Sequence, residues 1–374
     1  MIFASLLMLV TTPAGIGPHE SAAPVAYLTD VSSGATLYAR DEKRRIPTAS
    51  MAKMMTAWVA FEAIKTGKIK PKQTYKVSNA TWKKWNNTGS SMFLKAGEDV
   101  SVENLLHGVL TVSGNDASVV LAEGIAGSEA AFIVRMNAAA KKLGMVNSRF
   151  GTANGWPDEG VTYSTARDLA LLAEKIITDH PALFRQYFGQ SSFSWNGVTQ
   201  ANRNPLLGAV AGADGMKTGH SDEAGYCLVG TVQQGKRRLL MVVAGLPTQS
   251  ARINEARNLM RWGFDAWQAK PLFARGRIVA HIPVQLGDMS QIAVIAPRDL
   301  AATLLKGSNT NFKLTIRYKG AVKAPFAKGA EIAQLVVKFP NGTQQTMPLV
   351  AANSVQTAGF WGRAWNGVKS LAGA

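Results

Sequence analysis

Large apolar residues recur at helical spacing after a short polar segment near the start of the chain. Five of them repeat at steps of one, three or four residues: Met54, Met55, Trp58, Val59 and Phe61. Such a repeat predicts a helix, and the preceding Pro47 and Thr48 are residues that commonly start one. Ser50 and Lys53 fall in its first turn and share one face, because they lie three residues apart.

Two more apolar stretches meet at a polar triplet. Residues 105–112 are largely apolar and end at Ser113-Gly114-Asn115, and a second apolar stretch, 119–125, follows. A triplet of this composition is typical of a turn. The pattern predicts that Ser113 and Asn115 lie at the junction of two buried segments.

A hairpin is predicted further along the chain. Residues 225–232 and 238–244 have the composition of strands, and the polar turn 233–236 joins them. Lys217-Thr218-Gly219 comes just before the first of these strands. We therefore expect this triplet to lie on or beside an antiparallel sheet.

The pattern changes after residue 265. Short alternating segments, separated by glycines, predict five strands: 277–286, 291–296, 312–318, 331–339 and 343–350. Residues 271–352 are expected to form a small all-β domain, a sandwich, with a positional role. This stretch contains none of the polar triplets described above.

Both ends of the chain carry apolar patterns. Ile2–Val10 is followed by Ser21-Ala22-Ala23, which predicts a secretory signal peptide, residues 1–23, cleaved near residue 23. No Lys or Arg precedes this run, so a buried strand or helix is the alternative. Residues 355–374 predict an amphipathic helix that either lies in a membrane interface with Trp361 and Trp365 at headgroup depth, or packs on the β domain.

Charge indicates an anionic partner. The net charge is +17, and residues 270–374 hold thirteen Lys/Arg against three Asp/Glu, a net +10. No helix-turn-helix or stacking-aromatic pattern supports nucleic acid, so an anionic membrane surface or an acidic wall polymer fits better. A basic protein kept soluble by its charge is the alternative.

Composition limits the remaining possibilities. The chain has 374 residues, 47% of them hydrophobic, which suits a folded protein of about two domains. The single cysteine, Cys227, lies in an apolar strand and is interpreted as a packed core residue and not as a reactive thiol. The five histidines show no metal-binding spacing, so no metal and no cofactor are predicted.

Ser50 and Lys53 have a plausible joint chemistry. A serine hydroxyl needs a base within hydrogen-bond reach to act as a nucleophile. Lysine can serve as that base if burial or nearby cations lower its pKa. S-x-x-K, S-x-N and K-T-G, in this order, form the known signature of penicillin-binding proteins and serine β-lactamases.

Residues 25–263 resemble the low-molecular-mass penicillin-binding proteins, specifically the serine D-alanyl-D-alanine carboxypeptidases. Five further segments carry the resemblance: 91–95, 113–117, 163–168, 202–204 and 214–220. The resemblance implies an α+β catalytic domain, residues 24–267, with helices on both sides of an antiparallel sheet. The β domain and the C-terminal helix also fit the family's arrangement.

The resemblance assigns roles to nine residues. Ser50 is the expected nucleophile and Lys53 its general base, while Ser113 relays a proton and Asn115 orients the substrate. The expected substrate-binding residues are Lys217, Thr218, Gly219, His220 and Arg203. The implied substrate is the pentapeptide stem of peptidoglycan, which loses its terminal D-alanine, and β-lactams would bind Ser50 covalently. The implied location is the periplasmic face of the cytoplasmic membrane or another extracytoplasmic part of the cell envelope.

Three alternatives stay open. A DD-endopeptidase and a serine β-lactamase share the triplets, although a β-lactamase would not need the β domain and the tail. A catalytically silent scaffold that binds the cell wall is the third. The intact Ser50, Lys53 and Lys217 argue against it.

Overall fold

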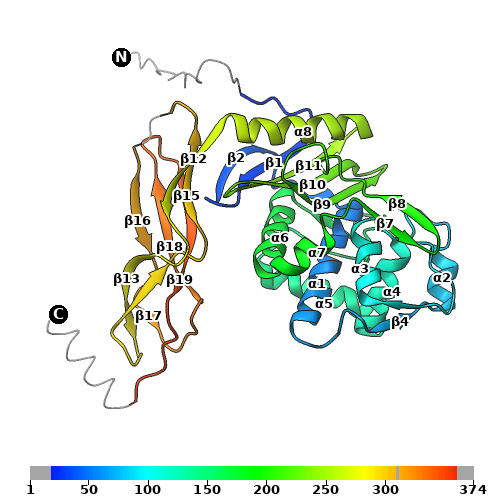
Figure 1. Ribbon diagram of the computed structural model, residues 1–374, viewed down its shortest axis with the longest axis horizontal. Coiled ribbons are helices and arrows are strands. Elements are labelled where there is room, and N and C mark those ends of the chain that lie inside the picture. The colour runs from blue at the N-terminus through cyan, green and yellow to red at the C-terminus, as the bar shows by residue number, and fades with distance from the viewer. Residues whose placement is uncertain (1–17, 309–310, 360–374) are drawn as a thin grey trace. The chain divides into compact units, whose positions relative to one another are not determined.

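The computed structural model describes residues 18–308 and 311–359 (Figure 1). Contacts divide the chain into two units. One contains residues 19–29 and 36–263, and the other contains residues 30–35 and the described residues from 264 onward. The first unit holds all three motifs, and the second consists mainly of strands.

A five-stranded sheet forms the centre of the first unit, in the order β2-β1-β11-β10-β9. Its strands are β1 (Val25–Asp30), β2 (Ala35–Arg40), β9 (Ala213–Ser221), β10 (Gly225–Gln234) and β11 (Arg237–Leu246). The predicted hairpin is confirmed, because β10 pairs antiparallel with both β11 and β9. Lys217 opposes Val229 in the second pair, so the third motif lies on β9 itself.

Helices lie on both sides of this sheet, with α8 on one side and α1 and α6 on the other (Figure 1). The helical elements are η1 (Ala49–Ala52), α1 (Lys53–Lys65), α2 (Asn79–Trp85), α3 (Val102–Leu110), α4 (Asn115–Ala126), α5 (Glu129–Leu143), α6 (Ala166–Asp179), α7 (Pro181–Tyr187) and α8 (Gln249–Asp265). Three short strand pairs complete the unit: β3 (Ile46–Pro47) with β6 (Tyr163–Ser164), β4 (Thr74–Lys76) with β5 (Asp99–Ser101), and β7 (Ser192–Trp195) with β8 (Val198–Ala201). The α+β class predicted from the sequence is confirmed.

The helix after Ser50 differs from the prediction in one respect. Ser50 lies in the 3₁₀ turn η1, and the α-helix begins only at Lys53. Ten of the thirteen residues of α1 are buried, including Lys53. Because it is covered on nearly all sides, α1 holds Lys53 inside the core and not on an amphipathic face.

The second unit is built from two sheets. β12 (Trp267–Phe273) pairs with β15 (Leu300–Leu305). A six-stranded sheet follows the order β16 (Lys313–Arg317), β18 (Glu331–Lys338), β19 (Gln344–Ala351), β14 (Gln291–Ile295), β13 (Ile278–Gln285) and β17 (Val322–Lys323). Apolar residues from both sheets, among them Leu304, Leu335 and Met347, form one core. The five predicted strands correspond to β13, β14, β16, β18 and β19.

β pairing in the second unit extends beyond the predicted range 271–352. β12 begins at Trp267, and isolated bridges join Val355 to Phe326 and Thr357 to Gly287. Residues 355–358 are therefore part of the β structure and not the first turn of the predicted amphipathic helix. The rest of that predicted helix, residues 360–374, lies outside the described residues.

Residues 19–23, the last part of the predicted signal peptide, belong to the first unit. Ser21 and Ala23 are buried, and His19–Thr29 belong to the same unit as the sheet and α8. A leader that ended at residue 23 would remove five residues of this folded unit. Residues 1–17 of the predicted signal peptide lie outside the described part of the chain.

Within the described residues, no single helix is both long and apolar enough to cross a membrane. Only α4 and α5 together meet the criteria of length and composition, and they are bent by 86° where they meet.

Candidate active site

Lys53 lies at the centre of the site, fully buried, and contacts three oxygen atoms. Its Nζ is 2.9 Å from Ser50 Oγ, 2.8 Å from Asn115 Oδ1 and 2.6 Å from the backbone oxygen of Asn154. The oxygens of Asn115 and Asn154 can only accept, so they take the two N–H bonds of a neutral amine. The lone pair of that amine then faces the Ser50 hydroxyl, which is the arrangement that a general base requires.

The surroundings of Lys53 favour the neutral amine. Burial lowers the pKa of Lys53 well below its ordinary value, and the cation of Lys217 lowers it further. The carboxylate of Asp116 raises this pKa and Arg203 lowers it, both by less. Neutral Lys53 can therefore accept a proton from Ser50, which an ordinary, charged lysine could not.

The second motif forms a tight junction between α3 and α4. Ser113 has a positive φ of 67°, and the chain then enters α4 at Asn115. Next to it, the buried Asp116 accepts hydrogen bonds from Ser91 Oγ at 2.7 Å and from the backbone N–H groups of Met92 and Leu94. One carboxylate thus fixes both the start of α4 and the loop that faces it.

The third motif brings strand β9 against the turn that carries Ser50. A Cβ atom at Gly219 would lie 2.9 Å from the backbone oxygen of Thr48, so only glycine allows this approach. Lys217 is buried and donates from Nζ to the backbone oxygen of Thr218 at 3.0 Å. Burial and the cations Arg203 and Arg252 lower the pKa of Lys217 to about 7.

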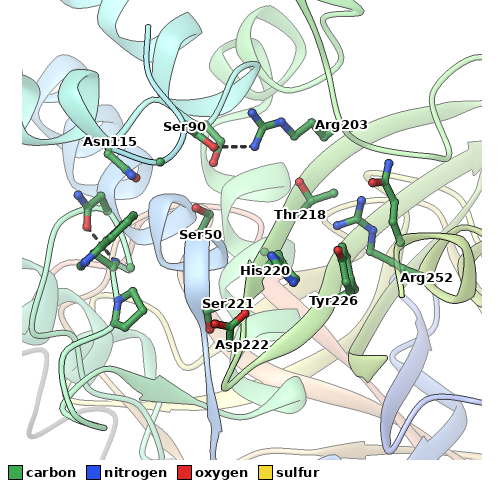
Figure 2. A pocket seen from close by; sticks show the side chains of 18 residues that line it. Ser50, Ser90, Asn115, Arg203, Thr218, His220, Ser221, Asp222, Tyr226 and Arg252 are labelled. Carbon is green, nitrogen blue, oxygen red and sulfur yellow. Dashed lines mark hydrogen bonds between the residues drawn. The ribbon is translucent and has the colours of Figure 1, made fainter. Parts of the chain in front are cut away.

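A pocket of about 660 Å³ opens in front of Ser50. Figure 2 shows Ser50 between Asn115, which lies on one side, and Thr218 and His220, which lie on the other. Arg203 lies at the rim, where it donates a hydrogen bond to Ser90 Oγ at 2.6 Å. The other arginine in the lining, Arg252, lies over the ring of Tyr226 with its guanidinium carbon 5.5 Å from the ring centre.

The structure brings all nine predicted residues to this region. Seven of them line the pocket: Ser50, Ser113, Asn115, Arg203, Thr218, Gly219 and His220. Lys53 and Lys217 are buried and are not part of the lining. Among the described residues, Ser113 makes no side-chain hydrogen bond to Ser50 or Lys53, so its expected proton relay would require substrate to complete the path.

Sequence reasoning missed several residues of the site, notably Asn154, Trp156 and Arg252. Asn154 supplies an acceptor to Lys53 from a loop 101 residues away. Trp156 is 40% exposed on the pocket wall and packs edge-on against Trp85, with ring centres 5.5 Å apart. The dipeptide Asn154-Gly155 signals a turn, but nothing in the spacing links it, or Arg252 on α8, to Ser50.

In the described part of the chain, no group of three or more His, Cys, Asp or Glu residues could hold a metal ion. Cys227 is fully buried, as interpreted from the sequence, and its Sγ lies 3.2 Å from the backbone oxygen of Ala224. Burial raises the pKa of this thiol to about 11, which keeps it protonated. The fold and the site together define a serine-type enzyme with a buried lysine amine beside the serine hydroxyl.

Family models match both parts of the chain. One described as D-alanyl-D-alanine carboxypeptidase matches residues 11–248, and one described as penicillin-binding protein 5, C-terminal domain, matches residues 267–357. The chain is 36% identical to the D-alanyl-D-alanine carboxypeptidase DacA of Haemophilus influenzae, over 94% of this chain and 90% of that protein. It is also 36% identical to DacC of Escherichia coli, over 91% of this chain and 86% of that protein.

Solved structures agree with these matches. Penicillin binding protein 5 from Haemophilus influenzae superposes with a TM-score of 0.76 at 34% identity, over 91% of this chain and 100% of that one. Penicillin-Binding Protein D2 from Listeria monocytogenes, in its ampicillin-bound form, gives 0.60 at 31% identity, over 67% of this chain and 100% of that one. The chain belongs to the D-alanyl-D-alanine carboxypeptidase family, as its motifs predicted.

The network around Asp116 generates a stability prediction. Asp116→Ala leaves the Ser91 hydroxyl and the backbone N–H groups of Met92, Leu94 and Ala117 without their acceptor. We expect a loss of at least about 2 kcal/mol in the free energy of unfolding, measured by urea denaturation. The control is Asp99→Ala, which removes an exposed carboxylate 3.9 Å from Lys76 Nζ and should change stability by less than about 1 kcal/mol. Equal losses of unfolding free energy in the two variants would contradict the structural role given to Asp116.

Proposed function

We propose that this chain removes the C-terminal D-alanine from the pentapeptide stems of peptidoglycan through an acyl-enzyme on Ser50. The family supports this activity and its substrate class. The observation that carries the mechanism is the fully buried Lys53 amine, 2.9 Å from Ser50 Oγ, with two further acceptors that occupy its N–H bonds.

Acylation proceeds by proton transfer and attack. Lys53 takes the proton from Ser50, and Oγ attacks the carbonyl carbon of the penultimate D-alanine. Backbone N–H groups of Ser50 and His220 hold the oxyanion. The C–N bond then breaks as the proton held by Lys53 passes through Ser113 to the nitrogen of the departing D-alanine. Water later hydrolyses the ester, which releases the shortened stem and restores the Ser50 hydroxyl. Asn115 orients the acyl chain.

The cationic side of the pocket suits the free carboxylate of the substrate. Arg203 and Arg252 line the pocket together with the hydroxyl of Thr218. A guanidinium can bind a carboxylate through two parallel hydrogen bonds. Lys217, buried behind Thr218, adds positive charge without reaching the lining. Trp156 lies on the part of the wall formed by 154–157 and offers an apolar surface to the acyl chain.

β-Lactams are proposed to acylate the same serine. Their strained amide presents a carbonyl and a carboxylate as the peptide does, so the same base and the same cations would serve. The ampicillin-bound relative supports this reading for the family.

One prediction of the proposed function tests the nucleophile. Ser50→Ala should abolish both labelling by a fluorescent penicillin and release of D-alanine from a soluble pentapeptide, while the folded state persists. The control is Ser194→Ala, an exposed serine on β7, which should retain both activities. Release of D-alanine at the parental rate by folded Ser50→Ala would show that another residue is the nucleophile. Analysis of the products formed from cross-linked muropeptides distinguishes a carboxypeptidase from a DD-endopeptidase, because only an endopeptidase would cleave the cross-links.

Another prediction concerns the dependence of activity on pH. The value of kcat/KM should fall at low pH as Lys53 is protonated, and at high pH as Lys217, whose pKa is about 7, loses its proton. Arg252 lowers the pKa of Lys217, so Arg252→Ala should move the alkaline limb to higher pH. Arg257→Ala is the matched control, because this arginine donates to the backbone of Pro205 outside the pocket lining. An alkaline limb that stays in place in Arg252→Ala would remove Lys217 from the profile.

We further propose an extracytoplasmic location with attachment to an anionic membrane surface through the C-terminal segment. The substrate lies outside the cytoplasm. Residues 361–372 have a helical pattern with two tryptophans on the apolar face, and the same segment contains the basic residues Arg363 and Lys369. Each basic residue adds about 1 kcal/mol near an anionic leaflet, so attachment should be reversible and sensitive to salt.

The structure indicates where this segment should be cut for a test. Val355 is fully buried, and the backbone N–H of Ala358 donates to the backbone oxygen of Leu286 at 2.8 Å. Both residues therefore belong to the folded β domain, and the deletion should start at residue 360. The protein lacking residues 360–374 should not float with anionic liposomes at low salt, whereas the full chain should. Activity on a small soluble peptide should be the same for both. Equal flotation of the two proteins would contradict the anchor.

A further inference from the structure

One buried carboxylate joins the segment before β1 to helix α8. Glu255 is 5% exposed and accepts hydrogen bonds from His19 Nε2 at 3.0 Å, Ser21 Oγ at 2.6 Å and the backbone N–H of Ala22 at 3.1 Å. Within the described residues these are all the hydrogen-bond partners of its side chain. All three belong to residues 19–23, which we call the N-terminal strap.

The strap is itself held in place. Ala23 N donates to Ser21 Oγ at 3.1 Å, and the guanidinium of Arg40 donates to the backbone oxygen of Ser21. The ring of His19 packs against Tyr38 and Trp262, with both pairs of ring centres 5.6 Å apart. The strap is therefore packed into the first unit and is not a loose extension.

The strap supplies the donors that keep the buried Glu255 charged. Burial alone would raise the pKa of Glu255, but hydrogen bonds from His19, Ser21 and Ala22 lower it below its ordinary value. The carboxylate is thus ionised at neutral pH. Loss of the strap would remove all three hydrogen bonds that tie this carboxylate of α8 to the segment before β1.

Arg252 lies one turn before Glu255 on α8, and residues three apart share a face of a helix. It is 4% exposed and lines the pocket (Figure 2). Its side chain contacts the ring of Tyr226, and its Nε has no hydrogen-bond partner in the described part of the chain. Because its backbone is part of α8, the position of the guanidinium in the pocket depends on the position of α8.

We propose that the N-terminal strap is a positioning element: through Glu255 it holds α8 so that Arg252 faces the carboxylate of the substrate. It follows that the exported protein retains residues 19–23 and that any leader is cut before His19, not near residue 23. The inference rests on the carboxylate-binding role given to Arg252 under the proposed function.

The kinetic test compares two forms of the chain, one that begins at Pro18 and one that begins at Pro24, both ending at Ala374. With a soluble pentapeptide, the shorter form should show a KM higher by roughly tenfold, with kcat changed by less than about twofold. Ser21→Ala in the longer form should raise KM in the same direction by less. Asn254→Ala, an exposed change on α8, is the control and should leave both constants unchanged.

A double-mutant cycle separates positioning from general destabilisation. In the Arg252→Ala background, removal of the strap should raise KM no further. An additive rise would overturn the positioning role, because the strap would then act without Arg252. If Arg252→Ala alone left KM unchanged, the role of Arg252 under the proposed function would fail, and this inference with it, while Ser50 acylation would be unaffected.

The processing claim has its own readout, the N-terminal sequence of the protein recovered from the cell envelope. A start at or before His19 is expected. A start at Pro24, in a protein with the KM of the longer form, would overturn the inference. Should the form that begins at Pro24 fail to fold, a cut near residue 23 is excluded, and Ser21→Ala, which removes one hydroxyl, decides the kinetic claim.

Discussion

The site depends on the enclosure of one amine. Lys53 is fully buried, and one of its three oxygen contacts comes from the adjacent turn η1. The other two come from segments that are distant in sequence, the start of α4 and the loop at Asn154. Burial makes the charged form of Lys53 unfavourable, and two pure acceptors fix the direction of its remaining lone pair. The base therefore forms only when the core of the first unit has closed around it.

Two glycines allow these segments to come close enough. A Cβ atom at Gly155 would lie 1.9 Å from the backbone oxygen of Ala49, and one at Gly219 would lie 2.9 Å from that of Thr48. The loop that presents Asn154 and the strand that presents Thr218 both pack directly on the turn of Ser50. Gly155 also has a positive φ of 74°, a conformation that other residues rarely adopt.

Local spacing predicted the parts of the site that lie on one element or beside one turn. A three-residue step placed Lys53 against Ser50, and the hairpin 225–244 placed Lys217 on a neighbouring strand. Asn154 and Arg252 could not be predicted in this way, because folding alone brings them to Ser50. β15 was missed for a local reason: Leu-Ala-Ala-Thr-Leu-Leu lacks the alternation that marks a half-buried strand. The packing of Ser21 and Ala23 could not be predicted either, because small residues suit a cleavage site and a tightly packed segment equally well.

The central claim is that Lys53 is a neutral amine in the resting enzyme. It can be tested by a pH titration of lysine ¹³Cε signals in the labelled protein, with the Lys53 resonance assigned by its absence in Lys53→Arg. The account predicts that this resonance titrates well below the ordinary lysine value of 10.5. A Lys53 resonance that titrated at or above 10.5 would contradict the account.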